Sequence, residues 1–87
     1  MYSVFTFTEL SNAQLYAILA LRSKIFVLEQ NINYLDIDGN DEACLHVCRF
    51  ESGELVAYAR LVPPGVKFDE PSIGRIVVDK DYRSKGV

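Results

Sequence analysis

Four short stretches of apolar, β-branched and aromatic residues, separated by turn-forming residues, predict four strands. Residues of these types favour the extended conformation, and the polar residues between them favour turns. The expected strands are Tyr2–Thr8, Ala43–Phe50, Leu55–Val62 and Ile73–Val78. Residues 51–54, Glu-Ser-Gly-Glu, join the second strand to the third, so these two strands are expected to form a hairpin.

A helical pattern lies between the first two strands. Ser11 and Gln14 have the Ser-x-x-Gln spacing of a capping box, which predicts that a helix begins there. The apolar residues that follow fall on one arc when each residue is rotated by about 100°. The helix, straight or kinked, is expected to run to about Gln30, and the polar residues 31–42 then form an acidic loop.

The order strand, helix, three strands predicts an α+β fold, in which an antiparallel meander carries the helix on one face. A chain of 87 residues allows a single domain, 1–87. Its composition, 49% hydrophobic and 24% charged, is that of a globular protein and excludes a disordered chain.

The charge and apolar patterns exclude several kinds of partner. Nine basic and twelve acidic residues give a net charge of −3, so no global positive field exists to bind nucleic acid. No apolar run approaches the ~20 residues that span a bilayer, and no basic region precedes an apolar stretch at the start. We therefore expect a cytoplasmic protein without a nucleic-acid or membrane partner.

Cys44, His46 and Cys48 form a Cys-x-His-x-Cys string that invites a zinc interpretation. On the expected strand the three side chains share one face, but neighbouring members lie ~6.6 Å apart. One metal with ligands at ~2.0 to 2.3 Å cannot collect them, and the two sulfurs are too far apart for a disulfide. We expect free thiols packed in the core, and no metal.

Two charged residues, Arg22 and Glu29, fall near the middle of the apolar arc of the helix. A buried charge is costly unless it is paired, so both are expected to face the interior or a cleft. Seven residues of straight helix separate them by ~10.5 Å, so they need different partners or a kink. The alternatives are an internal salt bridge to the acidic loop and a role in a substrate site.

The acidic loop resembles a calcium loop at its start only. Asp36, Asp38 and Asn40 match the first three ligand positions of an EF-hand. Calcium is not expected, because Asp41 and Val47 stand where that loop needs glycine and glutamate. The loop is either a solvated acidic segment or a negative rim that attracts a cationic amine substrate.

His46 is the only histidine in the sequence, and histidine titrates near neutrality, so it is a candidate general base. A hydrogen-bonded structural role is favoured, because nothing in the sequence places a nucleophile beside it. Arg60 is expected on the other face of the third strand, where it pairs with the acidic loop or serves a substrate site.

The end of the chain combines the apolar strand Ile73–Val78 with a basic, glycine-bearing segment, Tyr82–Val87. Backbone amides of such a segment can hold an anion, and glycine lets the chain approach it closely. The arrangement describes a pyrophosphate cradle, although one glycine among basic residues is also common in surface turns.

This segment resembles the acyl-CoA-binding motif of the GNAT superfamily of N-acyltransferases, R/Q-x-x-G-x-G/A, because Arg83-x-x-Gly86-x matches its first five positions. Most of the remaining chain is similar to the ElaA-like branch of that superfamily. The similar segments are Arg22-x-x-Ile25-Phe26-Val27-Leu28-Glu29-Gln30, Tyr34-x-Asp36-x-Asp38, Glu54–Arg60 and Ile73–Val77.

The resemblance implies a GNAT-like mixed sheet and transfer of an acyl group, usually acetyl, from acetyl-CoA to a small-molecule or peptide primary amine. The amine attacks directly, without a covalent enzyme intermediate, and a base removes its proton. The first candidate for this base is Glu29, with Asp36 or His46 behind it.

The resemblance also implies two sets of binding residues. On the acceptor side these are Arg22, Tyr34, Asp36, Asp38 and Arg60. The residues expected to contact acetyl-CoA are Ile76, Val77 and Val78, through their backbone, and Arg83, Ser84, Lys85, Gly86 and Val87.

The sequence stops at Val87, before the last glycine or alanine of the motif, so the resemblance implies the N-terminal half of such a domain. We expect the isolated chain to bind acetyl-CoA weakly and not to be a competent monomeric enzyme. Its fourth strand would lack a neighbour, and an apolar strand with a free edge favours a homodimer. The alternative function is a non-catalytic half-domain that acts as an interaction module.

Overall fold

The computed structural model describes residues 2–29, 36–66 and 69–82, and for Leu28 and Glu29 it describes the backbone alone. Its helices and strands are β1 (Tyr2–Thr6), α1 (Asn12–Ser23), the π-helical η2 (Lys24–Glu29), β2 (Leu45–Glu51), β3 (Glu54–Val62) and β4 (Ser72–Val78). Three short 3-10 turns accompany them: η1 (Phe7–Glu9), η3 (Asp41–Ala43) and η4 (Lys80–Tyr82).

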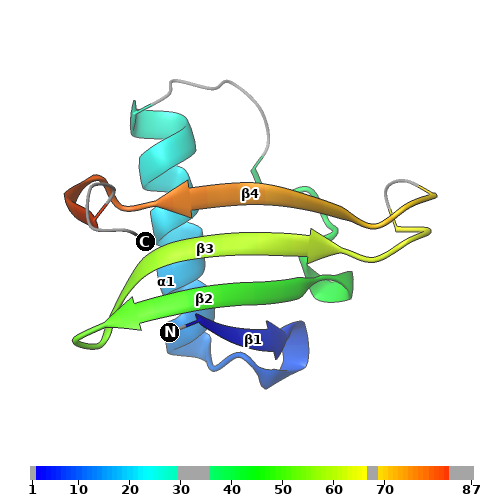
Figure 1. Cartoon of the computed structure of the whole chain (residues 1–87), viewed down its shortest axis with the longest axis horizontal. Helices are drawn as coiled ribbons and strands as arrows, with labels where there is room; N and C mark the ends of the chain where they lie inside the picture. The colour runs from blue at the N-terminus through cyan, green and yellow to red at the C-terminus, as the bar shows by residue number, and fades with distance from the viewer. Residues whose placement is uncertain (1, 30–35, 67–68, 83–87) are drawn as a thin grey trace.

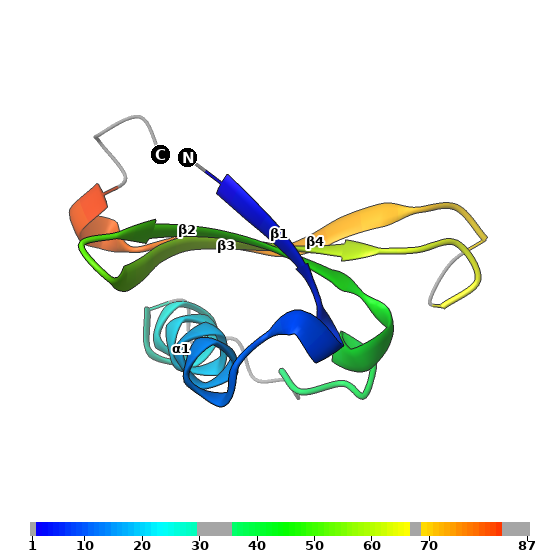
Figure 2. The ribbon, with the colours of Figure 1, turned by 90° about the horizontal axis from the view of Figure 1, so that it is seen from below.

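The strands form one antiparallel sheet in the order β1-β2-β3-β4, each paired with its neighbour in sequence (Figure 1). Helix α1 packs against one face of this sheet (Figure 2). Within the described ranges no α-helix covers the opposite face. The predicted α+β meander with a helix on one face is confirmed.

The helix begins where the sequence predicts. Ser11 Oγ accepts a hydrogen bond from the Gln14 amide at 3.0 Å, and Gln14 Oε1 accepts one from the Ser11 amide at 2.8 Å. This capping box satisfies two amides that the first turn of a helix leaves without partners. The regular α-helix ends earlier than expected, at Ser23, and continues as the π-helical η2. No helix in the part of the chain that the structure describes is both long and apolar enough to cross a membrane.

Two strands are shorter at one end than predicted. The first ends at Thr6 rather than Thr8, because the Thr6 amide donates to Glu9 Oε1 at 2.8 Å and the chain turns into η1. The second begins at Leu45 rather than Ala43, because η3 occupies the residues before it. In both cases residues whose side chains favour a strand adopt a local 3-10 turn instead.

The core lies between α1 and the sheet. Ile18, Leu21 and Ile25 on the helix side pack against Cys48, Tyr58 and Val77 on the sheet side, all at most 6% exposed. Cys44 and Cys48 are both buried and not in a disulfide, so the expectation of free core thiols is confirmed. Burial raises the pKa of Cys48 to about 11, which keeps its thiol protonated and unreactive near neutral pH.

Candidate functional site

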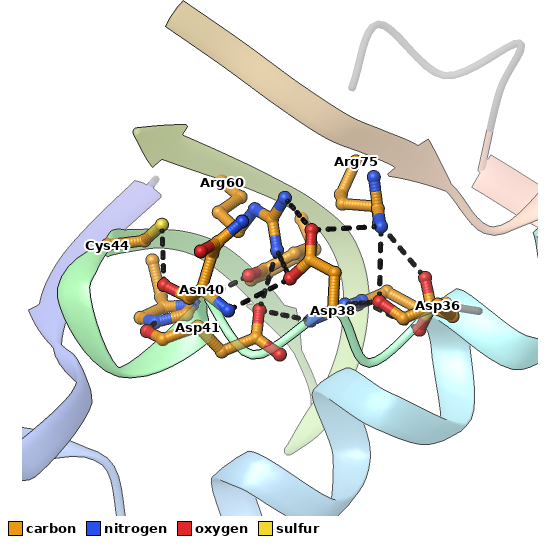
Figure 3. Close-up of polar contacts among 10 residues, drawn as sticks. Asp36, Asp38, Asn40, Asp41, Cys44, Arg60 and Arg75 are labelled. Atoms are coloured by element: carbon orange, nitrogen blue, oxygen red, sulfur yellow. Dashed lines mark hydrogen bonds and ion pairs between the residues drawn. The ribbon is translucent and has the colours of Figure 1, made fainter. Parts of the chain in front are cut away.

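Three arginines converge on the described part of the acidic loop, residues 36–42. Arg22 comes from α1, Arg60 from β3 and Arg75 from β4, and Figure 3 shows Arg60 and Arg75 reaching the loop from neighbouring strands. Arg22 and Arg60 are 0% and 1% exposed. The prediction that Arg22 faces the interior is confirmed, and the side chain of Glu29 lies outside the described residues.

Asp41 connects the helix to the sheet. Its Oδ1 atom lies 2.8 Å from Arg22 Nη1 and 3.0 Å from Arg60 Nη1, and both contacts are buried. Burial alone would lower the pKa of Arg22, but the hydrogen bond to Asp41 and the charges of Asp41 and Asp36 outweigh it and raise that pKa. Both guanidinium groups therefore remain charged and share the Asp41 carboxylate.

Asp36 and Asp38 hold the rest of the loop. Asp36 Oδ2 lies 3.0 Å from Arg22 Nε, and Asp36 Oδ1 accepts from Arg75 Nε at 3.1 Å. Arg60 binds Asp38 through two parallel bonds, Nη1 to Oδ1 at 2.9 Å and Nη2 to Oδ2 at 2.8 Å. These bonds from Arg60 hold the pKa of Asp38 well below its usual range, and the same contact raises the pKa of Arg60.

The network is balanced in charge among these six residues. Three guanidinium groups face three carboxylates, and the side chains of Asp36, Asp38 and Asp41 are only 10%, 18% and 10% exposed. Of the alternatives for Arg22, the internal salt bridge to the acidic loop is present. The substrate-binding roles of Arg22, Asp36, Asp38 and Arg60 stay predictions, and a field that attracts cations would have to come from other carboxylates.

No group of three or more histidine, cysteine, aspartate or glutamate side chains is arranged to hold a metal ion within residues 2–29, 36–66 and 69–82. The arrangement of the loop explains this in part. Its carboxylate oxygens bind Arg22 of α1, Arg60 of β3 and Arg75 of β4 rather than a common centre. Figure 3 shows the contacts with Arg60 and Arg75.

His46 is fully buried, and both of its ring nitrogens are hydrogen-bonded. Nε2 lies 2.8 Å from the Asp41 carbonyl oxygen, which can only accept, so Nε2 carries the proton. The Tyr58 hydroxyl therefore donates a hydrogen bond to Nδ1 at 2.6 Å. Burial lowers the pKa of His46 and raises that of Tyr58, so the ring is neutral and the hydroxyl is protonated. This geometry favours the structural role of His46 over that of a general base.

Arg60 does not lie where the sequence analysis placed it. The register pairs His46 directly with Arg60, so both side chains project from the same face of the sheet, towards the acidic loop. The expectation that Arg60 lies on the other face was wrong. The pairing register of β2 and β3 differs by one residue from the one assumed, which moves Arg60 to the face of His46. Of the two alternatives for Arg60, the pairing with the acidic loop is present.

The expected acyl-CoA residues divide into described and undescribed ones. Strand β4 places Val77 in the core with Ile76 63% exposed beside it. The segment expected to bind pyrophosphate, Arg83, Ser84, Lys85, Gly86 and Val87, lies outside the described residues, and so does Tyr34.

Two residues of the network, Asp41 and Arg75, were not among the predicted site residues. Arg75 is a charge inside the otherwise apolar strand Ile73–Val78, which is the same signal that singled out Arg22 on its helix. Asp41 was considered only as a misfit in a calcium loop. Three arginines stand in apolar stretches of the sequence, and three aspartates stand in the acidic loop. Matching the two numbers would have indicated that Arg75 and Asp41 belong to the network.

The first prediction concerns Asp41. Asp41→Asn should lower the free energy of unfolding by about 3 kcal/mol or more, because it leaves two buried guanidinium groups short of one negative charge. Chemical denaturation followed by circular dichroism measures this change. Glu42→Gln is the matched control, since Glu42 is the exposed neighbouring carboxylate and its loss should change stability by less than about 0.5 kcal/mol. Equal effects of the two substitutions would contradict the role of Asp41.

The second prediction concerns pH. Because the folded-state pKa of His46 is lowered, the unfolded chain binds a proton more readily, so stability that is fully present above about pH 6.5 is lost as the pH falls below it. His46 is the only histidine, so His46→Gln should flatten this slope, which is at most ~1.4 kcal/mol per pH unit for one proton. Denaturation curves at several pH values measure both slopes, and an unchanged slope in the variant would refute the assignment.

The chain has recognisable relatives. The profile of the acetyltransferase (GNAT) family matches residues 9–87. Protein ElaA of Escherichia coli is 43% identical over 82 residues, which cover 92% of this chain and 54% of that protein. The UPF0039 protein sll0451 of Synechocystis is 42% identical over 81 residues, which cover 92% of this chain and 53% of that protein. The chain thus spans about half the length of these curated relatives.

Solved structures agree with the sequence comparison. The crystal structure of an acyl-CoA N-acyltransferase from Pseudomonas aeruginosa matches 99% of this chain and 60% of its own with a TM-score of 0.90 and 33% identity. The crystal structure of Escherichia coli ElaA matches 95% of this chain and 57% of its own with a TM-score of 0.88 and 40% identity. Since the family profile covers most of the sequence and the fold agrees with both structures, the chain belongs to the acetyltransferase (GNAT) family.

Proposed function

We propose that the protein carrying this sequence transfers an acetyl group from acetyl-CoA to a primary amine. Membership of the GNAT family supports acyl transfer in general. The observation on which the proposed arrangement of donor and acceptor rests is the contact of Arg75 on β4, the strand expected to hold the thioester, with Asp36 of the loop expected on the acceptor side. One ion pair therefore links the two expected substrate sites.

On the donor side, backbone amides near Val77 and Val78 would bind the thioester arm and polarise its carbonyl. Arg83, Ser84, Lys85, Gly86 and Val87 would hold the pyrophosphate through charge and backbone amides. Acetyl-CoA is a substrate in this scheme, and no metal is needed for the reaction.

On the acceptor side, a base takes a proton from the ammonium group, and the neutral amine nitrogen attacks the carbonyl carbon. The new C–N bond forms as the C–S bond breaks, and the leaving thiolate of coenzyme A takes up a proton. Glu29 is our candidate for the base, because Asp36 already binds two arginines and His46 has no free ring nitrogen.

This proposal is tested on the natural gene product that contains the sequence. Acetyl-CoA should raise its thermal unfolding midpoint, and adding primary amines should release free coenzyme A thiol. Glu29→Gln should lower kcat by about 100-fold, within the usual contribution of a general base, and leave the Kd for acetyl-CoA nearly unchanged.

Glu54→Gln, at the exposed first residue of β3, is the control and should leave kcat unchanged. Absence of both thermal protection and thiol release with every acyl-CoA and amine tried would refute acetyl transfer. Normal turnover in Glu29→Gln would leave acetyl transfer standing and remove Glu29 as the base.

A second candidate function is supported by the border of the described sheet. Strand β4 forms this border, and its Ile73 and Ile76 are 62% and 63% exposed. We propose that this edge can pair with a second copy of the chain, because an apolar edge strand readily recruits another strand. Analytical ultracentrifugation of the 87-residue chain should show a concentration-dependent dimer, which Ile76→Lys should weaken. A monomer at all concentrations would exclude this function.

A further inference from the structure

Strand β4 contains a bulge directly opposite β3. Tyr58 pairs with Val77, but Arg60 pairs with Gly74, so the single residue between them on β3 faces two residues on β4, Arg75 and Ile76. A bulge of this kind bends a strand, increases its twist and locally interrupts the regular pairing. The backbone that follows the bulge is the part of β4 that we propose holds the thioester.

Arg75 adopts an unusual backbone conformation at the bulge. Its φ of +52° lies in the left-handed region. Residues other than glycine rarely adopt this backbone conformation, which costs them on the order of 1 kcal/mol or more. Gly74, the preceding residue, does not adopt a positive φ, although glycine would do so without strain. The chain therefore places an arginine at the strained position directly beside an available glycine.

The side chain of Arg75 accounts for this placement. Nε donates to Asp36 Oδ1 at 3.1 Å, and Nη2 donates to the Asp36 carbonyl at 3.1 Å and lies 3.3 Å from Asp38 Oδ2. Only 10% of the side chain is exposed. Arg22 on the helix binds Asp36, and Arg60 on β3 binds Asp38. These contacts fix the position of the acidic loop to which Arg75 is bonded.

We infer that Arg75 is a positioning residue that couples the bulge of β4 to the acidic loop. This inference rests on the proposed function, in which β4 aligns the acyl carbonyl and the loop borders the amine. The side chain keeps the strained backbone in place, and the bulge in turn fixes how far the donor carbonyl lies from the acceptor. A displacement of about 1 Å between reacting groups can reduce a rate by about 100-fold.

The test uses three substitutions in the natural gene product. Arg75→Gly removes the side chain and also relieves the strain in φ, so it should fold while losing the coupling. Arg75→Lys keeps the charge without the planar fork and should recover part of the loss. Arg49→Ala is the matched control, because Arg49 lies on β2 away from the loop and pairs loosely with Glu51 at 3.7 Å.

Two readouts separate this inference from the proposed function. Native-state hydrogen exchange should become at least about tenfold faster in Arg75→Gly at the amide of Asn40, in the loop, and at that of Val77, after the bulge. In the same variant kcat should fall by about 10- to 100-fold while the Kd for acetyl-CoA stays within about threefold. Arg49→Ala should change neither the exchange rates nor kcat.

Exchange that accelerates at Val77 while Asn40 stays protected would overturn the coupling, because the bulge would then relax independently of the loop. Wild-type kcat in Arg75→Gly would overturn the positioning role. If the wild-type protein transfers no acyl group at all, the proposed function and the positioning role both fail. The exchange rates at Asn40 and Val77 still decide whether the loop and the bulge are physically coupled.

Discussion

The need to neutralise buried guanidinium groups dominates the arrangement of the sheet, its helix and the acidic loop. Arg22 and Arg60 are withdrawn from water on two elements that face each other, and neither can leave without exposing the core. The desolvation of such ions is offset only when carboxylates approach with good geometry. The acidic loop supplies those carboxylates, and its position follows from where the arginines are.

Asp41 connects the helix, the sheet and the acidic loop through the need to neutralise the buried arginines. Its carboxylate binds arginines from α1 and β3, while its carbonyl fixes the proton of His46 and, through the ring, the hydroxyl of Tyr58. Buried ion pairs of this kind often add little net stability compared with apolar residues of the same volume. Their directional bonds do restrict the loop to one arrangement, as the acceptor site that we propose beside the loop would require.

Features that depend on residues close in sequence were predictable, and features that depend on distant residues were not. The capping box at Ser11 and the misfit of Arg22 on the apolar arc depend on neighbours in sequence or on helical spacing, and both were predictable. The bulge at Arg75 depends on the pairing register of two strands, which the residues of one strand alone do not determine. The hydrogen bond from His46 to the Asp41 carbonyl involves a backbone atom, so no side-chain pattern indicates it.

The helix illustrates the same limit. The apolar arc was drawn with the rotation of an α-helix, and it described the residues up to Ser23 well. From Lys24 to Glu29 the backbone is π-helical, so each turn contains more residues than a turn of an α-helix. An ideal α-helical wheel therefore does not apply to residues 24–29, and π-helical segments of this kind are frequent at functional sites.

The spacing of the network along the chain also has a consequence for how the protein folds. Arg22 and Asp41 are 19 residues apart in the sequence, and Asp36 and Arg75 are 39 residues apart. The hairpin between β2 and β3 closes through a short local turn, whereas these ion pairs require loops whose closure costs more entropy. The acidic loop should therefore order late, after β4 has joined the sheet. Substitutions in the network should then act mainly on the unfolding rate and leave the folding rate nearly unchanged.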